Sequence, residues 1–372
     1  MNKYVHPVIE QEEIDAVNEV LKSGILSGFR ANQEYHLGGK AVQAFEREFR
    51  EYHGVKYAIS FSSATTALHA ALVACGVGSG DGVITSPFTF SASASCILMA
   101  GAEVVFADIQ DDIFNIDPLK VFNSVTPKTK AIIPIHLMGH PADMRGITSV
   151  AAQYHLRVIE DAAQAIGAEY RGRKVGTIGD CGIFSFNQSK PISTGEGGML
   201  ITNNDEIAEI ARVVRNHGEV STNLKVLGYN YRMGEMEAAL GLAQFQKLES
   251  RNNRRIELAN HLTEALKEID GLIPPVVYPD CKHVYYTYGV KRKKNKLEFQ
   301  KRLIERGVYF GLGGQKPLHL YPFYGGRKGQ FPVAERMEGE MIFTDILRYP
   351  MTIEDVDEMV NIIKEEHEKV HS

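Results

Sequence analysis

The chain has 372 residues, of which 44% are hydrophobic and 23% are charged, and its formal net charge is −5. This length exceeds what one hydrophobic core usually fills, so we expect a large domain and a smaller one. The acidic balance argues against a nucleic-acid partner, because nucleic-acid-binding domains are normally basic. The N-terminal segment lacks an apolar signal core and no run of about 18 apolar residues occurs, so we expect no membrane partner and no export.

Cysteine usage indicates a reducing compartment. The four cysteines lie far apart, without a Cys-x-x-Cys pair and without histidines at metal-ligand spacing; they are Cys75, Cys96, Cys181 and Cys281. This pattern predicts neither a disulfide framework nor a metal site, and it favours a cytoplasmic location.

Two amphipathic helices are predicted first, over residues 12–24 and 41–54. Both place apolar residues at helical spacing and both end at a glycine, the residue preferred at a left-handed helix end. The segment 28–40 between them, "GFRANQEYHLGGK", is polar, contains glycine and is too long for a tight turn. We expect this segment to be an active-site loop or an arm at a dimer interface.

Residues 57–202 alternate short β-rich runs with segments of helical period, which predicts β-α crossovers and a mostly parallel sheet. Helices are expected at 64–76, 91–101 and 142–155. The β-rich runs lie at 57–63, 82–87, 102–108, 130–137, 157–163, 181–187 and 197–202. The predicted fold class is therefore α/β, with a mostly parallel central sheet in a large domain.

A long helical stretch at 230–271 leads out of this unit, and the pattern then changes. A strand is expected at 283–292, a helix at 296–307 and an apolar run at 307–312, followed by a closing helix that starts near Thr352. We predict a boundary near residue 250, with a large domain over 1–250 and a small C-terminal α+β domain over 251–372.

Two chemically distinctive groups are associated with neighbouring strand runs. Asp161, next to Glu160, lies near the end of a run, where open α/β sheets bind their ligands, although an acidic residue there can equally be a helix cap. Lys190 lies beyond the next run, and Pro191 is expected to end that strand at the lysine because proline cannot extend the ladder. A carboxylate and a lysine so placed can hold pyridoxal 5′-phosphate (PLP): the carboxylate pairs with its protonated pyridine nitrogen and the lysine forms a Schiff base.

The turn at residues 62–66, "SSATT", lies between a strand and a helix and suits the phosphate of this cofactor. Backbone N–H groups at a helix start bind phosphate, and Ser63, Thr65 and the later Ser185 can donate hydroxyls. Such a turn on its own is also typical of an ordinary N-cap. His136 lies in an apolar run, so we expect a core histidine there and not a catalytic base.

Three motifs in consistent order resemble the fold-type I PLP enzymes, and within them the DegT/StrS-type sugar aminotransferase family, nearly from end to end. They are "EDAAQAIGAEYRGRKVGTIGD", "FSFNQSKPISTGEGGML" and "LGYNYRMGEMEAALGLAQF". The resemblance implies that Lys190 is the Schiff-base lysine and that Asp161 is the pyridine partner.

The resemblance also implies a set of further contacts. It gives Phe90 and Ala163 on the two faces of the cofactor ring, Gln164 beside the ring or the substrate, Ala64, Thr65 and Ser185 at the phosphate, Asn230 at the phosphate of a partner subunit, and His319 in a loop near the substrate. Ala64 departs from the family, which usually has glycine there.

The activity implied by the resemblance is transfer of an amino group from an amino acid, L-glutamate, to a nucleotide-linked keto sugar. An aminocyclitol precursor or a free keto acid sugar is an alternative acceptor, because the segment 28–40 is longer than the loop typical of the family. A sugar dehydratase of this fold carries histidine in place of Lys190, and a non-catalytic regulator has no need of Lys190, Asp161 and Ser185 together. The expected partners are the donor, the acceptor and a second copy of the chain, in a homodimer with shared active sites.

Overall fold

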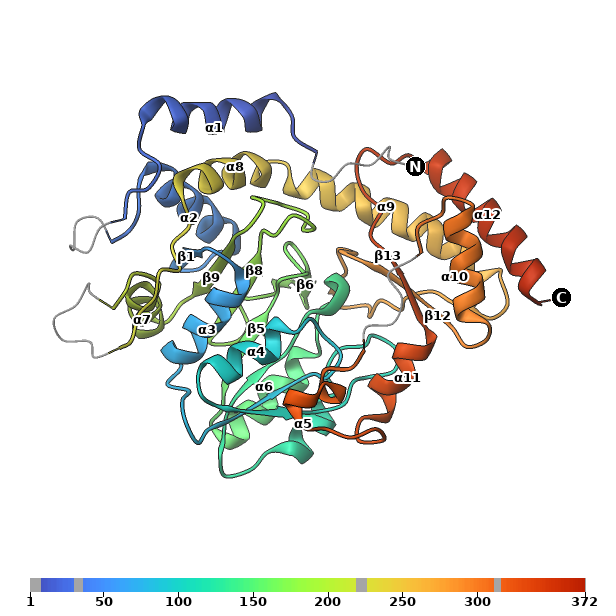
Figure 1. The fold of residues 1–372 in the computed structure, drawn as a ribbon, viewed down its shortest axis with the longest axis horizontal. Helices are drawn as coiled ribbons and strands as arrows, with labels where there is room; N and C mark the ends of the chain where they lie inside the picture. The colour runs from blue at the N-terminus through green and yellow to red at the C-terminus, as the bar shows by residue number, and fades with distance from the viewer. Residues whose placement is uncertain (1–7, 30–35, 219–225, 311–315, 372) are drawn as a thin grey trace.

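A seven-stranded β-sheet forms the centre of the larger part of the molecule (Figure 1). The structure is a computed structural model that describes residues 8–29, 36–218, 226–310 and 316–371. All seven strand runs predicted from the sequence take part in this sheet. In spatial order its strands are β1 (Tyr57–Phe61), β9 (Gly198–Thr202), β8 (Cys181–Ser185), β5 (Arg157–Asp161), β4 (Thr129–Ile133), β2 (Gly82–Thr85) and β3 (Glu103–Phe106).

Strand direction in this sheet follows from how the chain connects the strands. Strands β3, β2, β4, β5 and β8 are parallel, whereas β9 runs antiparallel to both of its neighbours, β8 and β1. The chain passes from β8 to β9 through a loop without a crossover helix, and such a connection reverses the strand direction. The sheet is therefore mixed with a parallel majority, and the loop that contains Lys190 starts at the carboxyl end of β8.

Helices cover both faces of the sheet, which is what a buried, largely parallel sheet requires. On one face the apolar side chains of the sheet pack with α3 (Ala64–Ala74), α4 (Ala92–Met99) and α7 (Asp205–Arg215). The helices packed on the other face are α2 (Lys40–His53), α5 (Pro118–Ser124), α6 (Met144–Tyr154) and α8 (Glu235–Phe245). The predicted helices at 41–54, 64–76, 91–101 and 142–155 are thus confirmed.

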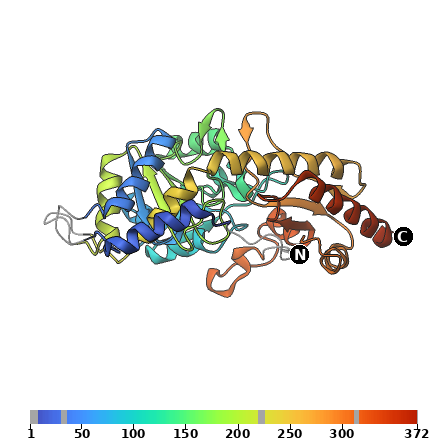
Figure 2. The ribbon, with the colours of Figure 1, turned by 90° about the horizontal axis from the view of Figure 1, so that it is seen from above.

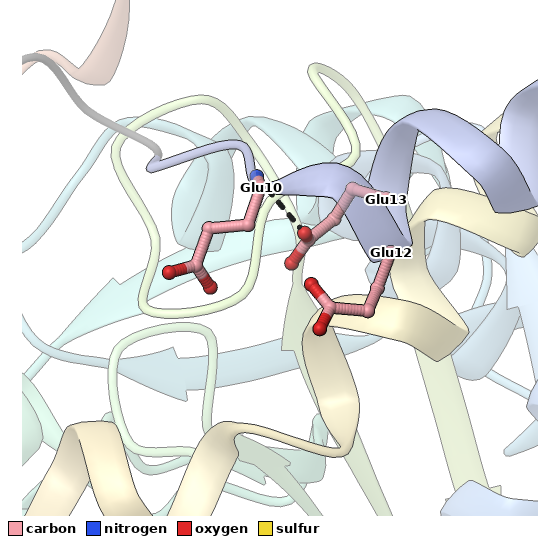
Figure 3. Close-up of side chains that lie close together, drawn as sticks. All are labelled: Glu10, Glu12 and Glu13. Carbon is pink, nitrogen blue, oxygen red and sulfur yellow. Dashed lines mark hydrogen bonds between the residues drawn. The ribbon is translucent and has the colours of Figure 1, made fainter.

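Helix α1 (Gln11–Ser23) is tied to the rest of the molecule by charge. Glu10, Glu12 and Glu13 bring their carboxylates together at its start (Figure 3), within 4.8 Å of one another. The ammonium of Lys247 lies 2.6, 3.1 and 2.9 Å from these three carboxylates. A lysine thus occupies the place that a cation would take, so we interpret this cluster as an ion-pair anchor between α1 and the start of α9 (Leu248–Lys267).

Helix α9 runs from the part that contains the seven-stranded sheet into the C-terminal part, and the two parts lie side by side (Figures 1 and 2). There it packs with the three-stranded sheet of β10 (Leu272–Ile273), β12 (Tyr288–Arg292) and β13 (Met341–Thr344) and with α10 (Lys296–Glu305) and α12 (Ile353–His371). The remaining elements are α11 (Pro332–Glu340), a small sheet of β6 (Glu169–Tyr170), β7 (Arg173–Lys174) and β11 (Cys281–Lys282), and the 3-10 turns η1 (Leu137–Gly139), η2 (Leu318–Leu320) and η3 (Pro322–Tyr324).

The C-terminal part differs in detail from the prediction. The strand expected at 283–292 begins only at Tyr288, and the residues 307–310, described at the start of the run 307–312, form no strand. Strand β13, which pairs with β12, was not predicted, because its four residues directly follow a helix without a turn signal. Since α9 is continuous through residue 250, the division into two domains stays a prediction. Among the described residues, no helix has the length and apolar character needed to span a membrane.

Candidate active site

Asp161 and Lys190 lie at, or just after, the carboxyl ends of two neighbouring strands, at the same edge of the sheet. Asp161 is the last residue of β5, and it pairs in register with Ile183 of the parallel strand β8. Strand β8 ends at Ser185, so the expectation that Pro191 ends the strand at the lysine was wrong. A loop instead begins after Ser185, and Lys190 lies in it with its backbone N–H 2.8 Å from the carbonyl of Asn187.

The Asp161 carboxylate is 4% exposed and is held by two donors. The hydroxyl of Ser93 donates to its Oδ2 at 2.7 Å, and the backbone N–H of Ala163 donates to its Oδ1 at 3.1 Å. Burial raises the pKa of Asp161, while these two hydrogen bonds and the charge of Lys190 act in the opposite direction. A cationic N–H donor placed against this carboxylate would therefore stabilise its charged form.

Glu160, one residue earlier, faces the other side of the sheet and has a structural role. Its two oxygens accept backbone N–H groups from Gly176 at 2.8 Å and from Ile178 and Gly179 at 2.6 Å. The Nε2 of His136 lies 3.0 Å from Glu160 Oε2, and the His136 ring is completely buried. His136 is thus a core histidine, as predicted, since both of its ring nitrogens have partners: Nδ1 accepts the N–H of Ala142 at 3.0 Å.

The Lys190 side chain lies over an aromatic ring of the C-terminal part. Its Nζ is 4.1 Å from the centroid of Tyr286, and no described residue accepts a hydrogen bond from it. The Tyr286 hydroxyl lies 2.9 Å from the hydroxyl of Ser189. Within the described part of the chain, therefore, no carboxylate is bonded to the amine and would have to be displaced before it reacts with a carbonyl group.

The start of α3 forms a cradle beside the strand end of β8. Ser63 caps α3 by accepting the N–H of Thr66 at 3.1 Å, which is the ordinary N-cap considered above, and among the described residues nothing accepts the N–H groups of Ala64 and Thr65. Gly198 pairs with Ser185 of β8, and a Cβ on Gly198 would lie only 2.5 Å from the Ala64 nitrogen. Glycine at 198 thus brings Ser185 and the open N–H groups of α3 together, which suits a phosphate.

Three other predicted residues surround this group. Phe90 precedes Ser93 by one turn and is 65% exposed, so its ring is free to contact a ligand. Ala163 is held against Asp161 by the hydrogen bond described above. Gln164 accepts the backbone N–H of Met138 at 2.7 Å, in a turn where Met138 has a left-handed φ of 57°. Its amide NH2 group remains available to a ligand or to water.

The last two predicted residues are Asn230 and His319. Asn230 is exposed, and its neighbour Tyr231 accepts the N–H of Ser62 at 2.8 Å, which places the Asn230 segment beside the start of α3. His319 is only 1% exposed and lies 3.1 Å from Glu335, with its ring against Phe331. The His319 imidazole is therefore packed against Phe331 and bonded to Glu335, and its role near the substrate stays a prediction.

Three residues of the site were not predicted. Ser93 donates a hydrogen bond to the Asp161 carboxylate, and the ring of Tyr286 lies against the Lys190 amine. Gly198 allows the start of α3 to approach β8 closely. Gly197 and Gly198 are adjacent in the sequence, and only the register of β9 shows that Gly198 is the residue opposite Ser185. Ser93 lies in a run of serines and alanines in which no single position stands out, and Tyr286 lies in a run of three tyrosines within four residues.

Comparisons with known proteins identify one family over nearly the whole chain. The sequence profile described as the DegT/DnrJ/EryC1/StrS aminotransferase family matches residues 7–364. The spore coat polysaccharide biosynthesis protein SpsC of Bacillus subtilis is 38% identical, over 97% of this chain and 96% of its own. GDP-perosamine synthase of Caulobacter vibrioides is 39% identical, over 77% and 79% of the two chains. The X-ray structure of DesV from S. venezuelae has a TM-score of 0.87 at 32% identity, over 96% of this chain and 95% of DesV.

Proposed function

Since this chain belongs to the DegT/DnrJ/EryC1/StrS aminotransferase family and is a PLP-dependent sugar aminotransferase, we propose that it moves the amino group of L-glutamate to the keto group of a nucleotide-linked sugar. The observation that carries the proposal is the arrangement of Lys190, buried Asp161 and the open start of α3 at one edge of the sheet. One site thus offers a reactive amine, a fixed anion and a place for a phosphate.

The residues present fit PLP, the cofactor that the aminotransferases of this family use. The Gly198 cradle supports a phosphate held by the N–H groups of Ala64 and Thr65, with hydroxyls from Ser63 and Ser185. The remaining contacts that we propose are Lys190 at the aldehyde, Asp161 at the pyridine nitrogen, Phe90 and Ala163 on the ring faces and Gln164 beside the ring. When bound, PLP supplies an aldehyde that joins the donor's amine and a ring that withdraws electrons from the donor's α-carbon.

Two residues of the chain then do the chemical work. Lys190, once its amine is free, would take the proton from the donor's α-carbon and deliver it to the carbon that carried the cofactor's aldehyde. Such positioned proton transfer contributes about 10² to 10⁴ in rate. Asp161, as a carboxylate, would pair with the protonated pyridine nitrogen of the cofactor. Ser93 and the Ala163 N–H support this charge, because both donate to the carboxylate.

The acceptor is proposed from the names of the relatives. The name of GDP-perosamine synthase supports a nucleotide-linked sugar, and that of SpsC supports a role in polysaccharide biosynthesis. The segment 28–40, part of which lies outside the described residues, is the candidate for contacts with the sugar. An aminocyclitol precursor and a free keto acid sugar remain the alternative acceptors.

We also propose a homodimer in which Asn230 reaches the phosphate of the partner subunit. The exposed position of Asn230, on a segment fixed to the start of α3, supports this arrangement. The cytoplasm is the proposed location, because all four cysteines are free thiols.

The cofactor assignment is tested by visible absorption of the purified protein. Wild type and the control Lys174→Ala should carry the absorption band of lysine-bound PLP, and Lys190→Ala should lose it. An unchanged band in Lys190→Ala would refute the site. Addition of L-glutamate should then convert the wild-type band to that of the amine form of the cofactor, after which a panel of keto sugars, with and without a nucleotide, should restore the original band for the true acceptor. A regulator would show neither change, and a dehydratase would aminate no keto sugar.

A further inference from the structure

The ring of Tyr286, which lies against the Lys190 amine, is tied to the loop that contains the lysine. The Tyr286 hydroxyl lies 2.9 Å from the hydroxyl of Ser189, the residue before Lys190. Since Ser189 donates its own hydrogen to Oδ1 of Asn187 at 3.2 Å, it accepts the hydrogen of the Tyr286 hydroxyl. The outer end of the ring is thus bonded to the neighbour of the reactive residue.

The backbone of Tyr286 is fixed separately, by the turn η1. Gly139 in this turn has a left-handed φ of 94°, and a Cβ there would lie 2.9 Å from the Tyr286 nitrogen. The Gly139 carbonyl accepts the N–H of Val284 at 3.1 Å. The Met138 carbonyl accepts the N–H of Thr287 at 3.3 Å. Tyr286 belongs to the C-terminal part, but its two ends are therefore held by two loops of the part that contains the seven-stranded sheet.

The face of this fixed ring is what the amine contacts. The Nζ of Lys190 lies 4.1 Å from the ring centroid of Tyr286. A free lysine amine is charged near neutral pH, and an aromatic face attracts such a cation strongly enough to shift an equilibrium about 2- to 30-fold. Among the described residues no carboxylate is bonded to this amine, so the ring is the contact that holds it in its free state.

We propose that Tyr286 is a positioning residue that holds the Lys190 amine whenever this amine is not bonded to the cofactor. The proposal rests on the proposed function, in which Lys190 joins PLP. In that step the charged amine gives one proton to water, its nitrogen forms a double bond to the aldehyde carbon, and the aldehyde oxygen leaves as water with the two remaining hydrogens.

The two forms of the cofactor differ in what they require of the lysine. Binding of PLP takes the Lys190 amine from the ring of Tyr286. Pyridoxamine phosphate has an amine of its own and leaves Lys190 free to stay on the ring. Tyr286 therefore favours the amine form of the cofactor over the lysine-bound form, and its removal should shift this balance toward the lysine-bound form.

Affinities of the cofactor-free protein for PLP and for pyridoxamine phosphate test this preference without turnover. In Tyr286→Leu the ratio of the two affinities should rise about 2- to 30-fold in favour of PLP, whereas Tyr286→Phe, which keeps the ring, should keep most of the wild-type ratio. Tyr309→Leu is the control, because Tyr309 is 48% exposed. Thermal midpoints check the fold, and Tyr286→Met is the second variant without a ring.

A purely structural role of Tyr286 would weaken the binding of both cofactor forms together. An unchanged affinity ratio in Tyr286→Leu and Tyr286→Met would therefore overturn the proposal. An equal rise of the ratio in Tyr286→Phe would overturn it as well, because the ring would then have no part in the effect.

The donor half-reaction gives a second readout of the same difference. At a fixed ratio of L-glutamate to 2-oxoglutarate, the equilibrium ratio of the amine form to the lysine-bound form should fall in Tyr286→Leu by the factor found for the affinities. If wild type converts with no amino acid but the affinity ratio shifts as expected, the proposed function fails and the role of Tyr286 stands. If wild type converts and the Tyr286→Leu equilibrium is unchanged, only the role of Tyr286 fails.

Discussion

The hydroxyl of Ser93 donates a hydrogen bond of 2.7 Å to Oδ2 of Asp161, and the two residues are only 1% and 4% exposed. This bond joins the first turn of α4 to the carboxyl end of β5. Through this bond, helix α4 holds the Asp161 carboxylate in one orientation. The bond also favours the charged form of that carboxylate.

Replacing Ser93 by alanine should weaken the site without unfolding the protein. The buried carboxylate loses a hydrogen bond to a charged group, which is worth about 1.5 to 3 kcal/mol, so cofactor affinity should fall about 10- to 100-fold. Titration of the apoenzyme with PLP measures this change. Ser95→Ala on the same helix is the control, because the Ser95 hydroxyl donates to the Ala92 carbonyl of its own helix, at 3.5 Å. Equal affinities in the two variants would show that the Ser93 bond is incidental.

Glu160 and Asp161 are adjacent carboxylates with opposite roles, and a pair of amide variants should separate them. In Glu160→Gln, an NH2 group would face backbone N–H donors that now meet carboxylate oxygens at 2.6 to 2.8 Å, so we expect a loss of about 3 kcal/mol or more in unfolding free energy. In Asp161→Asn, a buried charge disappears, so stability should change little, while turnover should fall at least about 100-fold, because a neutral amide does not keep the pyridine nitrogen protonated.

Urea unfolding and the glutamate half-reaction, measured on both variants, check these expectations. The assignment is wrong if Asp161→Asn keeps wild-type turnover, or if Glu160→Gln loses activity at unchanged stability. The two residues differ in sequence position by one and therefore in the face of the strand that they occupy, so each variant serves as the control of the other.

The sequence allowed the sheet and the central pair of the site to be predicted, because those depend on local patterns. Apolar runs of strand length located all seven strands, and Asp161 and Lys190 were identified from their positions after neighbouring strands. The strand end before Lys190 was misplaced, because the pairing of β8 with β9 stops at Ser185, and this pairing involves residues that the local pattern around Pro191 does not include.

Long-range contacts account for what the sequence did not reveal. Ser93 meets Asp161 across 68 residues of chain, and Ser189 meets Tyr286 across 97, so neither pair leaves a local signal. His319 was expected near the substrate from the resemblance of its loop. The position of its ring depends on contacts with Phe331 and Glu335, which follow it by 12 and 16 residues. The sequence does not specify how the chain folds back between them.

Gly198 should tolerate no side chain, since an added Cβ would lie 2.5 Å from the Ala64 nitrogen and from the Ser63 carbonyl. Gly198→Ala should push the start of α3 away from β8 and cost about 1 to 3 kcal/mol of stability, with a larger proportional loss of PLP affinity, because the open N–H groups move with the helix. Gly339→Ala in α11 is the control, because nothing lies within 4 Å of its Cβ position. Wild-type PLP affinity in Gly198→Ala would contradict the cradle.

His53 should make the protein sensitive to acid. Its ring is 7% exposed, stacks on Phe49 at 4.5 Å and lies 4.8 Å from Phe184, and burial lowers its pKa to about 3. Between about pH 6.5, where an unfolded histidine takes up its proton, and pH 3, the unfolded chain binds more protons than the folded one. Stability therefore falls as pH falls through this window, by about 1.4 kcal/mol per pH unit for this one group.

Replacing His53 by phenylalanine should remove this sensitivity, because phenylalanine has no proton to bind and suits the aromatic surroundings. Urea unfolding at pH 6.5 and pH 5 should show a loss of stability about 2 kcal/mol smaller in His53→Phe than in wild type. His140, whose pKa is lowered to about 4, and His283 are present in both proteins, so the difference isolates His53. The exposed His155→Asn variant should keep the wild-type difference between the two pH values, and an undiminished difference in His53→Phe would mean that other groups cause the acid sensitivity.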